Sequence, residues 1–163
     1  MDPCTGCGFE YDLTLAPASS RAIVHGAGEL AGLVLAAPDA ARRSRPELWS
    51  PLEYGCHVRD VLLVQRERVL AARRMDCPSV EPMGREERAE HDGYAAQDPE
   101  RVTCELTDAA FMFANVLDRL GADDWERTLM YNYPALSERS LRWMAVHTEH
   151  EVKHHLVDVR HQL

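Results

Sequence analysis

The sequence lacks any long apolar run and holds few aromatic residues. No window approaches the roughly 18 uninterrupted apolar residues that a transmembrane helix needs. The first residues, MDPCTGCGFEYDLT, do not have the pattern of a secretory signal peptide. Aromatic residues account for 7% of the chain, so the core must rest mainly on Leu, Val, Ala and Met. We therefore expect a soluble, cytoplasmic protein.

Positive charge is also scarce. The formal net charge is −9 at pH 7, from 18 Lys and Arg against 27 Asp and Glu, and Lys153 is the single lysine. Nucleic acids and anionic membranes bind proteins through clustered positive charge. The composition therefore predicts neither a nucleic acid nor a membrane as a partner, and the partner that we expect is a small-molecule substrate.

A disulfide framework is not expected, because the five cysteines are an odd number in a chain of cytosolic character. The pair Cys4-x-x-Cys7 could form a second metal site or a redox pair, or be two solvated thiols near a frayed terminus. There is no second Cys-x-x-Cys. A structural zinc ion would therefore have to take further ligands from Cys77, Cys104 or His25.

Helix-start signals divide the chain into four long helices. Ser50-Pro51-Leu52-Glu53 combines an N-cap serine, a proline at the first helical position and a capping-box glutamate, and Asp98-Pro99 repeats the cap and the proline. No segment alternates convincingly with a period of two. Helical spacing of apolar residues predicts helices over 19–35, 50–74, 98–120 and from Ser137 or Ser140 to near the C-terminus.

The connection over residues 77–97 is acidic and has no persistent period, which is typical of a functional or mobile loop. Four long helices with one long connection predict an all-α four-helix bundle. The 163 residues fit a single metal-binding domain, 1–163, in which residues 1–15 form a Cys-bearing N-terminal lead-in. We expect a homodimer, because many bundles dimerise.

The histidines give the strongest functional signal, since four of the eight fall within nine residues. His150 and His154 are four residues apart, so on a helix they lie on one face, about 6 Å apart along the axis, and can share a metal ion. His57, near the start of the second helix, is the best candidate for a third ligand. Three protein ligands leave a coordination position open for water or substrate.

A rival register exists on the last helix. His147, Glu151 and His155 also follow each other at intervals of four, on a neighbouring face, and spacing alone does not choose between the two registers. His155 and Asp158 are three residues apart, so His155 could be a proton shuttle or a surface residue. Arg59 and Asp60 could orient a ligand histidine or be an ordinary solvated pair.

Two stretches resemble a known family. WSPLEYGCHVRDV, residues 49–61, resembles the second-helix motif of the DinB/YfiT-like superfamily, which also contains the mycothiol-dependent maleylpyruvate isomerases. HEVKHHLVDV, residues 150–159, resembles its last-helix motif. The start, Cys4-x-x-Cys7-Gly8-Phe9-x-Tyr11, is similar to that of actinobacterial members. The resemblance covers nearly the whole length.

The resemblance implies a four-helix bundle with a buried divalent metal ion, usually Zn or Ni, held by three side chains. These correspond to His57, His150 and His154. In the mycothiol-dependent branch one last-helix ligand is Glu, and this chain has His150 at that position.

Two kinds of function follow from this interpretation. The first is an enzyme whose metal ion activates water or a low-molecular-weight thiol such as mycothiol or bacillithiol, which would make it a thiol transferase, an isomerase or a hydrolase. The second is a non-catalytic module that binds a metal ion or a small ligand, in association with stress.

Overall fold

The capping signals in the sequence correspond to real helix starts. The computed structural model describes residues 3–133 and 135–163. In it the Ser50 hydroxyl accepts a hydrogen bond from the backbone N–H of Glu53, and the Glu53 carboxylate accepts one from the backbone N–H of Ser50. Asp98 caps the next long helix, and Ser140 caps the last. The long helices are α1 (Ser19–Ala36), α2 (Pro51–Arg74), α4 (Pro99–Leu117) and α5 (Leu141–Arg160).

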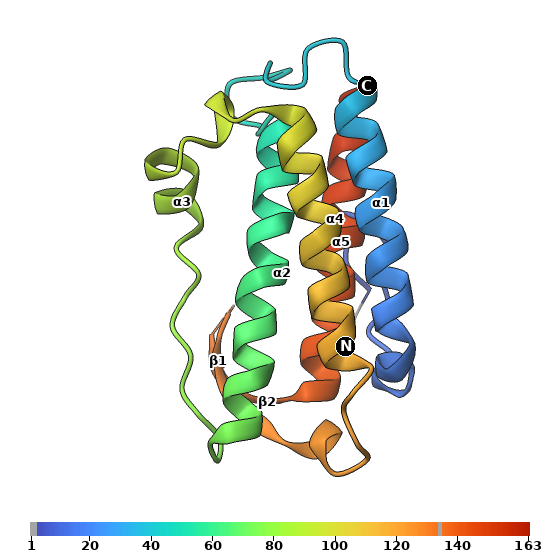
Figure 1. The fold of residues 1–163 in the computed structure, drawn as a ribbon, viewed down its shortest axis with the longest axis vertical. Helices are drawn as coiled ribbons and strands as arrows, with labels where there is room; N and C mark the ends of the chain where they lie inside the picture. Colours follow the sequence, from blue (N-terminus) through green and yellow to red (C-terminus); the bar gives the residue numbers. More distant parts are fainter. Residues whose placement is uncertain (1–2, 134) are drawn as a thin grey trace.

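The four long helices form the expected bundle, with an uncommon order of directions (Figure 1). The connection between α2 and α4 runs back along the outside of the bundle, so these two helices point the same way. It carries the short helix α3 (Arg85–His91) and a 3₁₀ turn, η2 (Tyr94–Ala96). α5 packs between α1 and α2, opposite α4.

The all-α four-helix bundle is confirmed, and it carries one small sheet that no pattern in the sequence predicts. The segment before α5 forms a small antiparallel hairpin of β1 (Thr128–Asn132) and β2 (Leu136–Ser140), after a 3₁₀ turn η3 (Asp124–Glu126). Each strand is only five residues long, too short for a clear period of two in the sequence. The third long helix also ends earlier than predicted, at Leu117.

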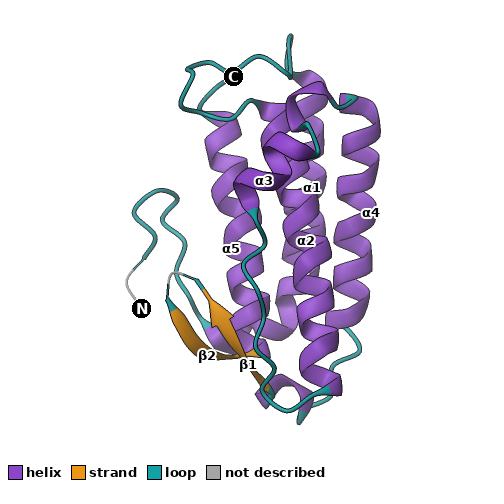
Figure 2. Ribbon diagram, turned by 90° about the vertical axis from the view of Figure 1, so that its left-hand side faces the viewer, coloured by secondary structure: helices purple, strands orange, loops and turns teal. Residues whose placement is uncertain are grey.

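The lead-in lies beside α5, on the same side of the bundle as the hairpin (Figure 2). Of its expected span 1–15, residues 3–15 are described, and it continues into the 3₁₀ helix η1 (Leu13–Ala18). Phe9 is buried, and the hydroxyl of Tyr11 contacts two histidines of α5. The lead-in is therefore packed against the bundle.

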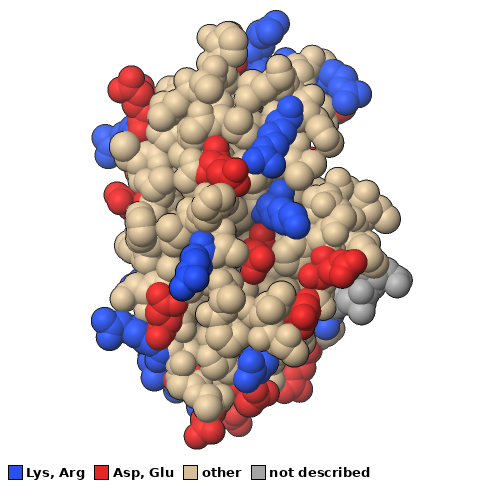
Figure 3. Space-filling view, turned by 90° about the vertical axis from the view of Figure 1, so that its right-hand side faces the viewer, with Lys and Arg blue, Asp and Glu red and all other residues tan. Residues whose placement is uncertain are grey.

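Charges of both signs are scattered over the face of the molecule shown in Figure 3, where Lys and Arg lie among Asp and Glu. Among the described residues, no helix combines the length and the apolar character that crossing a membrane requires. The core contains several polar side chains in addition to apolar ones. His57 and His147 are among them, 3% and 5% exposed.

Candidate metal centre

α5 presents one face of His147, Glu151 and His155 toward α2, where His57 lies in the second turn. His57, Glu151 and His155 each offer one donor atom, and these three atoms all lie within 4.8 Å of one another. The rings of His57 and His155 meet edge to face with centroids 4.9 Å apart. We call these three residues the His57 centre.

The structure groups the histidines differently from the sequence expectation. Among the described residues, no cluster of mutually close donors joins His57 to His150 or His154. Successive residues of a helix are rotated by about 100°, so His150 points away from His57 when its neighbour Glu151 points toward it. The rival register is the one that meets α2, and in it Glu151, which the expected set His57, His150 and His154 did not include, lies close to His57.

Burial controls the charge of His57. Burial is the main cause that lowers the pKa of His57, to about 3, and the neighbouring His155 and Arg85 add to it, so the imidazole of His57 is neutral near pH 7. Nδ1 of His57 is buried and has no hydrogen-bond partner among the described residues. The ring of Trp49 packs against that of His57 at 5.1 Å. A neutral imidazole with an unpaired nitrogen fits a metal ligand.

The other two members of the centre are held by neighbouring charges. Asp158 lies 2.9 Å from Nδ1 of His155, and Nε2 of His155 lies 3.8 Å from Glu151. Burial raises the pKa of Glu151, although the nearby charges of His155 and His154 oppose this. A histidine whose second nitrogen is held by a carboxylate is the usual arrangement around a bound metal ion. The donor set therefore fits a divalent transition metal.

A second cluster joins His147, His150 and Glu151, so it shares Glu151 with the His57 centre. The hydroxyl of Tyr11 lies 2.9 Å from Nδ1 of both His147 and His150. Burial and the charge of Glu151 raise the pKa of Tyr11, so the phenol keeps its proton. Sequence analysis did not select Tyr11, because nothing local connects it to histidines more than 130 residues away.

The Cys4 and Cys7 side chains meet the two histidines that do not reach His57. One donor atom from each of Cys4, Cys7, His150 and His154 lies within 4.8 Å of the other three. Among the described residues, Cys77, Cys104 and His25 belong to no such cluster. The further ligands expected for a Cys4–Cys7 site are therefore not the residues that the structure brings there.

Arg59 and Asp60 form a buried network away from the candidate ligands. Asp60 accepts hydrogen bonds from the Tyr94 hydroxyl at 2.7 Å and from Arg59 at 2.9 Å, and Arg59 also pairs with Glu105. Both are less than 10% exposed, so neither is a solvated surface residue. Their contacts hold the α2–α4 connection against α2.

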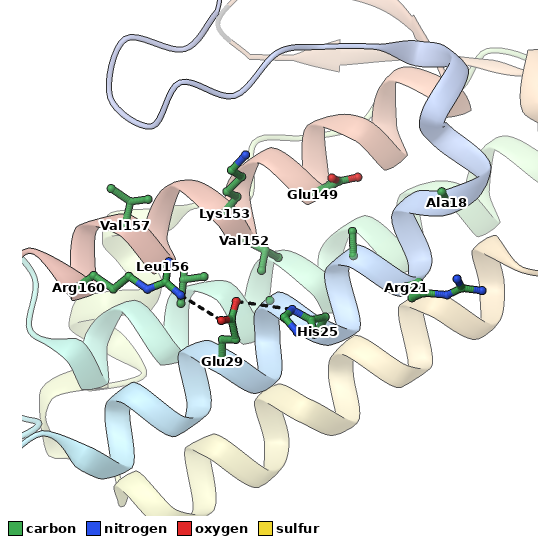
Figure 4. Close-up of a pocket in the computed structure, with 12 residues that line it drawn as sticks. Ala18, Arg21, His25, Glu29, Glu149, Val152, Lys153, Leu156, Val157 and Arg160 are labelled. Atoms are coloured by element: carbon green, nitrogen blue, oxygen red, sulfur yellow. Dashed lines mark hydrogen bonds and ion pairs between the residues drawn. The ribbon is translucent and has the colours of Figure 1, made fainter.

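A pocket of about 500 Å³ lies between α1 and α5 (Figure 4). At its edge Glu29 pairs with Arg160 at 3.0 Å and with His25 at 3.6 Å. Val152 and Leu156 contribute apolar surface. None of the members of the His57 centre lines this pocket.

Comparison with known proteins agrees with this fold. The fold is similar to that of YfiT from Bacillus subtilis, described as a probable metal-dependent hydrolase with an unusual four-helix bundle topology. The match has a TM-score of 0.82 at 13% sequence identity and covers 99% of this chain and 91% of that chain. No curated protein matches the sequence significantly. Residues 24–158 match the family model of the DinB superfamily, and the chain therefore belongs to that superfamily.

Proposed function

We propose that this protein is a metal-dependent enzyme of the DinB superfamily that holds one divalent transition-metal ion through His57, Glu151 and His155. The observation that supports this most strongly is the convergence of the three donor atoms from two helices within 4.8 Å, with an unpaired buried nitrogen on His57. Two imidazoles and one carboxylate are a donor set that zinc and nickel both accept.

The bound ion would act as a Lewis acid that lowers the pKa of a water molecule or a small thiol. The residues of the chain prepare the site for this role. Asp158 holds Nδ1 of His155, so Nε2 is the nitrogen directed to the site. His57 stays neutral because it is buried, and Trp49 and Tyr54 pack against the two imidazoles and limit access of water.

The substrate is a small molecule in this proposal, and an anionic one fits best. Arg85 of α3 lies over the ring of Trp49, with 5.4 Å from its guanidinium carbon to the ring centroid. Its positive charge lowers the pKa of both His57 and Glu151, so it lies near enough to act on the centre. Arg85 is exposed and could attract a carboxylate, or the anionic form of a thiol, to the centre.

The reaction class is hydrolysis or thiol transfer. The description of YfiT as a probable metal-dependent hydrolase supports activation of water. A low-molecular-weight thiol such as mycothiol is the alternative nucleophile, because three protein ligands leave room for an added one. Both reactions need the same open coordination position on the ion.

Metal analysis of ligand variants tests this function. The Cys4→Ser/Cys7→Ser background removes the two thiols of the cluster that Cys4 and Cys7 form with His150 and His154. In this background the protein should contain about one equivalent of zinc or nickel. Adding His57→Ala or Glu151→Gln should empty the site, whereas His25→Ala, at an exposed histidine of α1, should not. Full metal content in the His57→Ala/His155→Ala variant of the same background would contradict the proposal.

A further inference from the structure

Cys4, Cys7, His150 and His154 form a four-donor cluster that shares no residue with the His57 centre. In a tetrahedral zinc site, with Zn–S bonds of about 2.3 Å and Zn–N bonds of about 2.0 Å, a sulfur and a nitrogen lie about 3.5 Å apart. Sγ of Cys4 lies 3.5 Å from Nδ1 of His154. This separation is the one expected of two ligands of one ion.

The turn that carries the two cysteines is shaped to direct both sulfurs to one point. The backbone N–H of Gly8 donates to the carbonyl of Cys4 at 2.7 Å, and the N–H of Cys4 donates to the carbonyl of Phe9 at 2.9 Å. Gly8 has a φ of +69°, which favours glycine. A Cβ on Gly6 would lie 2.7 Å from Cε1 of His154, so the turn approaches α5 as closely as a glycine allows.

Backbone N–H groups also face the sulfurs. The backbones of Gly6 and Cys7 and the ring of His154 make hydrogen bonds to the sulfur of Cys4. The backbone of Phe9 makes a hydrogen bond to the sulfur of Cys7. Donors around a sulfur stabilise the thiolate, which is the form that binds metal ions.

The two histidines are oriented for the same role. The Tyr11 hydroxyl occupies Nδ1 of His150, so Nε2 is the nitrogen left for a ligand, and it is buried with no hydrogen-bond partner among the described residues. Nδ1 of His154 faces Cys4, while its Nε2 lies 3.7 Å from Asp158. Each imidazole therefore has one nitrogen near an outer polar group and one available to an ion.

We infer that Cys4, Cys7, His150 and His154 bind a second ion, a structural Zn²⁺ that fastens the lead-in to α5. Their order along the chain is Cys-x2-Cys followed by His-x3-His, which is the ligand spacing of structural zinc sites. Four protein donors complete a tetrahedral shell, so this site is closed to substrates. The site is part of the fold, and none of its ligands belongs to the His57 centre.

Metal stoichiometry of the full chain tests this inference. The wild-type protein, purified under reducing conditions and supplied with Zn²⁺, should bind about two equivalents. The Cys4→Ser/Cys7→Ser variant should bind about one. The Cys104→Ser variant, which removes an exposed thiol of α4, is the matched control and should bind as much as wild type.

Cobalt substitution separates the two centres. With Co²⁺ the wild-type protein should show an intense sulfur-to-metal charge-transfer band, because this cluster contains the thiolates and the His57 centre contains none. The band should persist in the His57→Ala/His155→Ala variant and disappear in Cys4→Ser/Cys7→Ser and in His154→Ala. Circular dichroism of each variant checks that the bundle is folded.

Two results would overturn the inference. The first is a wild-type protein with no charge-transfer band at saturating Co²⁺, or a band that survives in the double cysteine variant. The second is a Cys4–Cys7 disulfide, detected by mass spectrometry, that forms in air without displacing any bound Zn²⁺. The second result would identify the pair as a redox couple.

Discussion

Asp158 accepts a hydrogen bond from His155, with 2.9 Å between Oδ2 and Nδ1. The same oxygen lies 3.7 Å from Nε2 of His154. One carboxylate therefore supports a candidate ligand of each centre, three and four residues back along α5. Although burial opposes it, the hydrogen bond from His155 lowers the pKa of Asp158, which keeps this side chain negative near neutral pH.

Replacing Asp158 should weaken metal binding at the His57 centre. In the Cys4→Ser/Cys7→Ser background, Asp158→Ala leaves Nδ1 of His155 without its acceptor, and the affinity for Zn²⁺ should fall about 10–100-fold. Competition with a chromophoric chelator measures the affinity. Asp108→Ala, at an exposed aspartate of α4, is the control. An unchanged affinity in Asp158→Ala would show that the hydrogen bond does not support the ligand.

The His57 centre should accept an added thiol. In the Cys4→Ser/Cys7→Ser variant loaded with Co²⁺, a small thiol should produce a sulfur-to-metal charge-transfer band that is absent before the addition. The thiolate is the ligand, so binding should strengthen as the pH rises toward the pKa of the thiol. An unchanged spectrum at millimolar thiol would indicate a closed site and would favour a non-catalytic metal-binding module.

The metal-free protein should lose stability as the pH falls below about 6.5, the ordinary pKa of histidine. Burial lowers the pKa of His57 and His147 to about 3 and that of His150 to about 4. Between these values and 6.5 the unfolded chain binds more protons than the folded chain, so acid favours unfolding. Each histidine contributes up to about 1.4 kcal/mol per pH unit in this window.

Glu151 has the opposite effect on the pH dependence of stability. Burial raises its pKa, so its contribution to the free energy of unfolding is present at low pH and is lost as the pH rises. Denaturant unfolding in the presence of chelator, at several pH values between 7 and about 4, measures the net slope. His147→Gln removes one of the three histidines and should make the slope shallower. A stability that does not change over this range would mean that these histidines are hydrated in the folded protein.

Replacing two glycines of α1 by alanine, one at a time, should change the stability of the protein in opposite directions. A Cβ at Gly28 would meet no atom within 4 Å, so Gly28→Ala should stabilise the protein by about 0.5–1 kcal/mol through helix propensity. A Cβ at Gly26 would lie 2.8 Å from a methyl group of Val152, whose branched side chain has little freedom to move. Gly26→Ala should therefore destabilise by about 1 kcal/mol or more, and equal thermal midpoints for the two variants would contradict this.

The long helices could be predicted because their signals are local. Ser50, Pro51 and Glu53 lie within one turn, and their capping contacts depend little on the rest of the chain. The β hairpin could not be predicted in the same way. β1 depends on a contact between distant parts of the chain, because its Met130 also exchanges backbone hydrogen bonds with the segment 78–80 that follows α2.

The ligand residues could be predicted as a group, but their assignment to sites could not. His57 and the histidines of α5 stood out by residue type and spacing. The choice between His150 and Glu151 depends on how α5 is rotated in the bundle, which is set by the burial of residues such as Val152 and Leu156. Both registers are polar, so the sequence pattern did not distinguish them. The contact of Cys4 with His154 links residues 150 positions apart and arises only from the fold.

The Tyr11 hydroxyl has a single proton and lies between two imidazole nitrogens, so the two rings cannot be in the same tautomeric state toward it. An ion on Nε2 of His150 requires a proton on Nδ1, which is then donated to Tyr11. Tyr11 in turn donates to Nδ1 of His147, whose own proton must reside on Nε2, the nitrogen 3.8 Å from Glu151. A zinc ion held by Cys4, Cys7 and His150 would thus fix the direction of these hydrogen bonds, from His150 to Tyr11 and from Tyr11 to His147. The two centres have no common ligand, but these hydrogen bonds would connect His150 of one centre to Glu151 of the other.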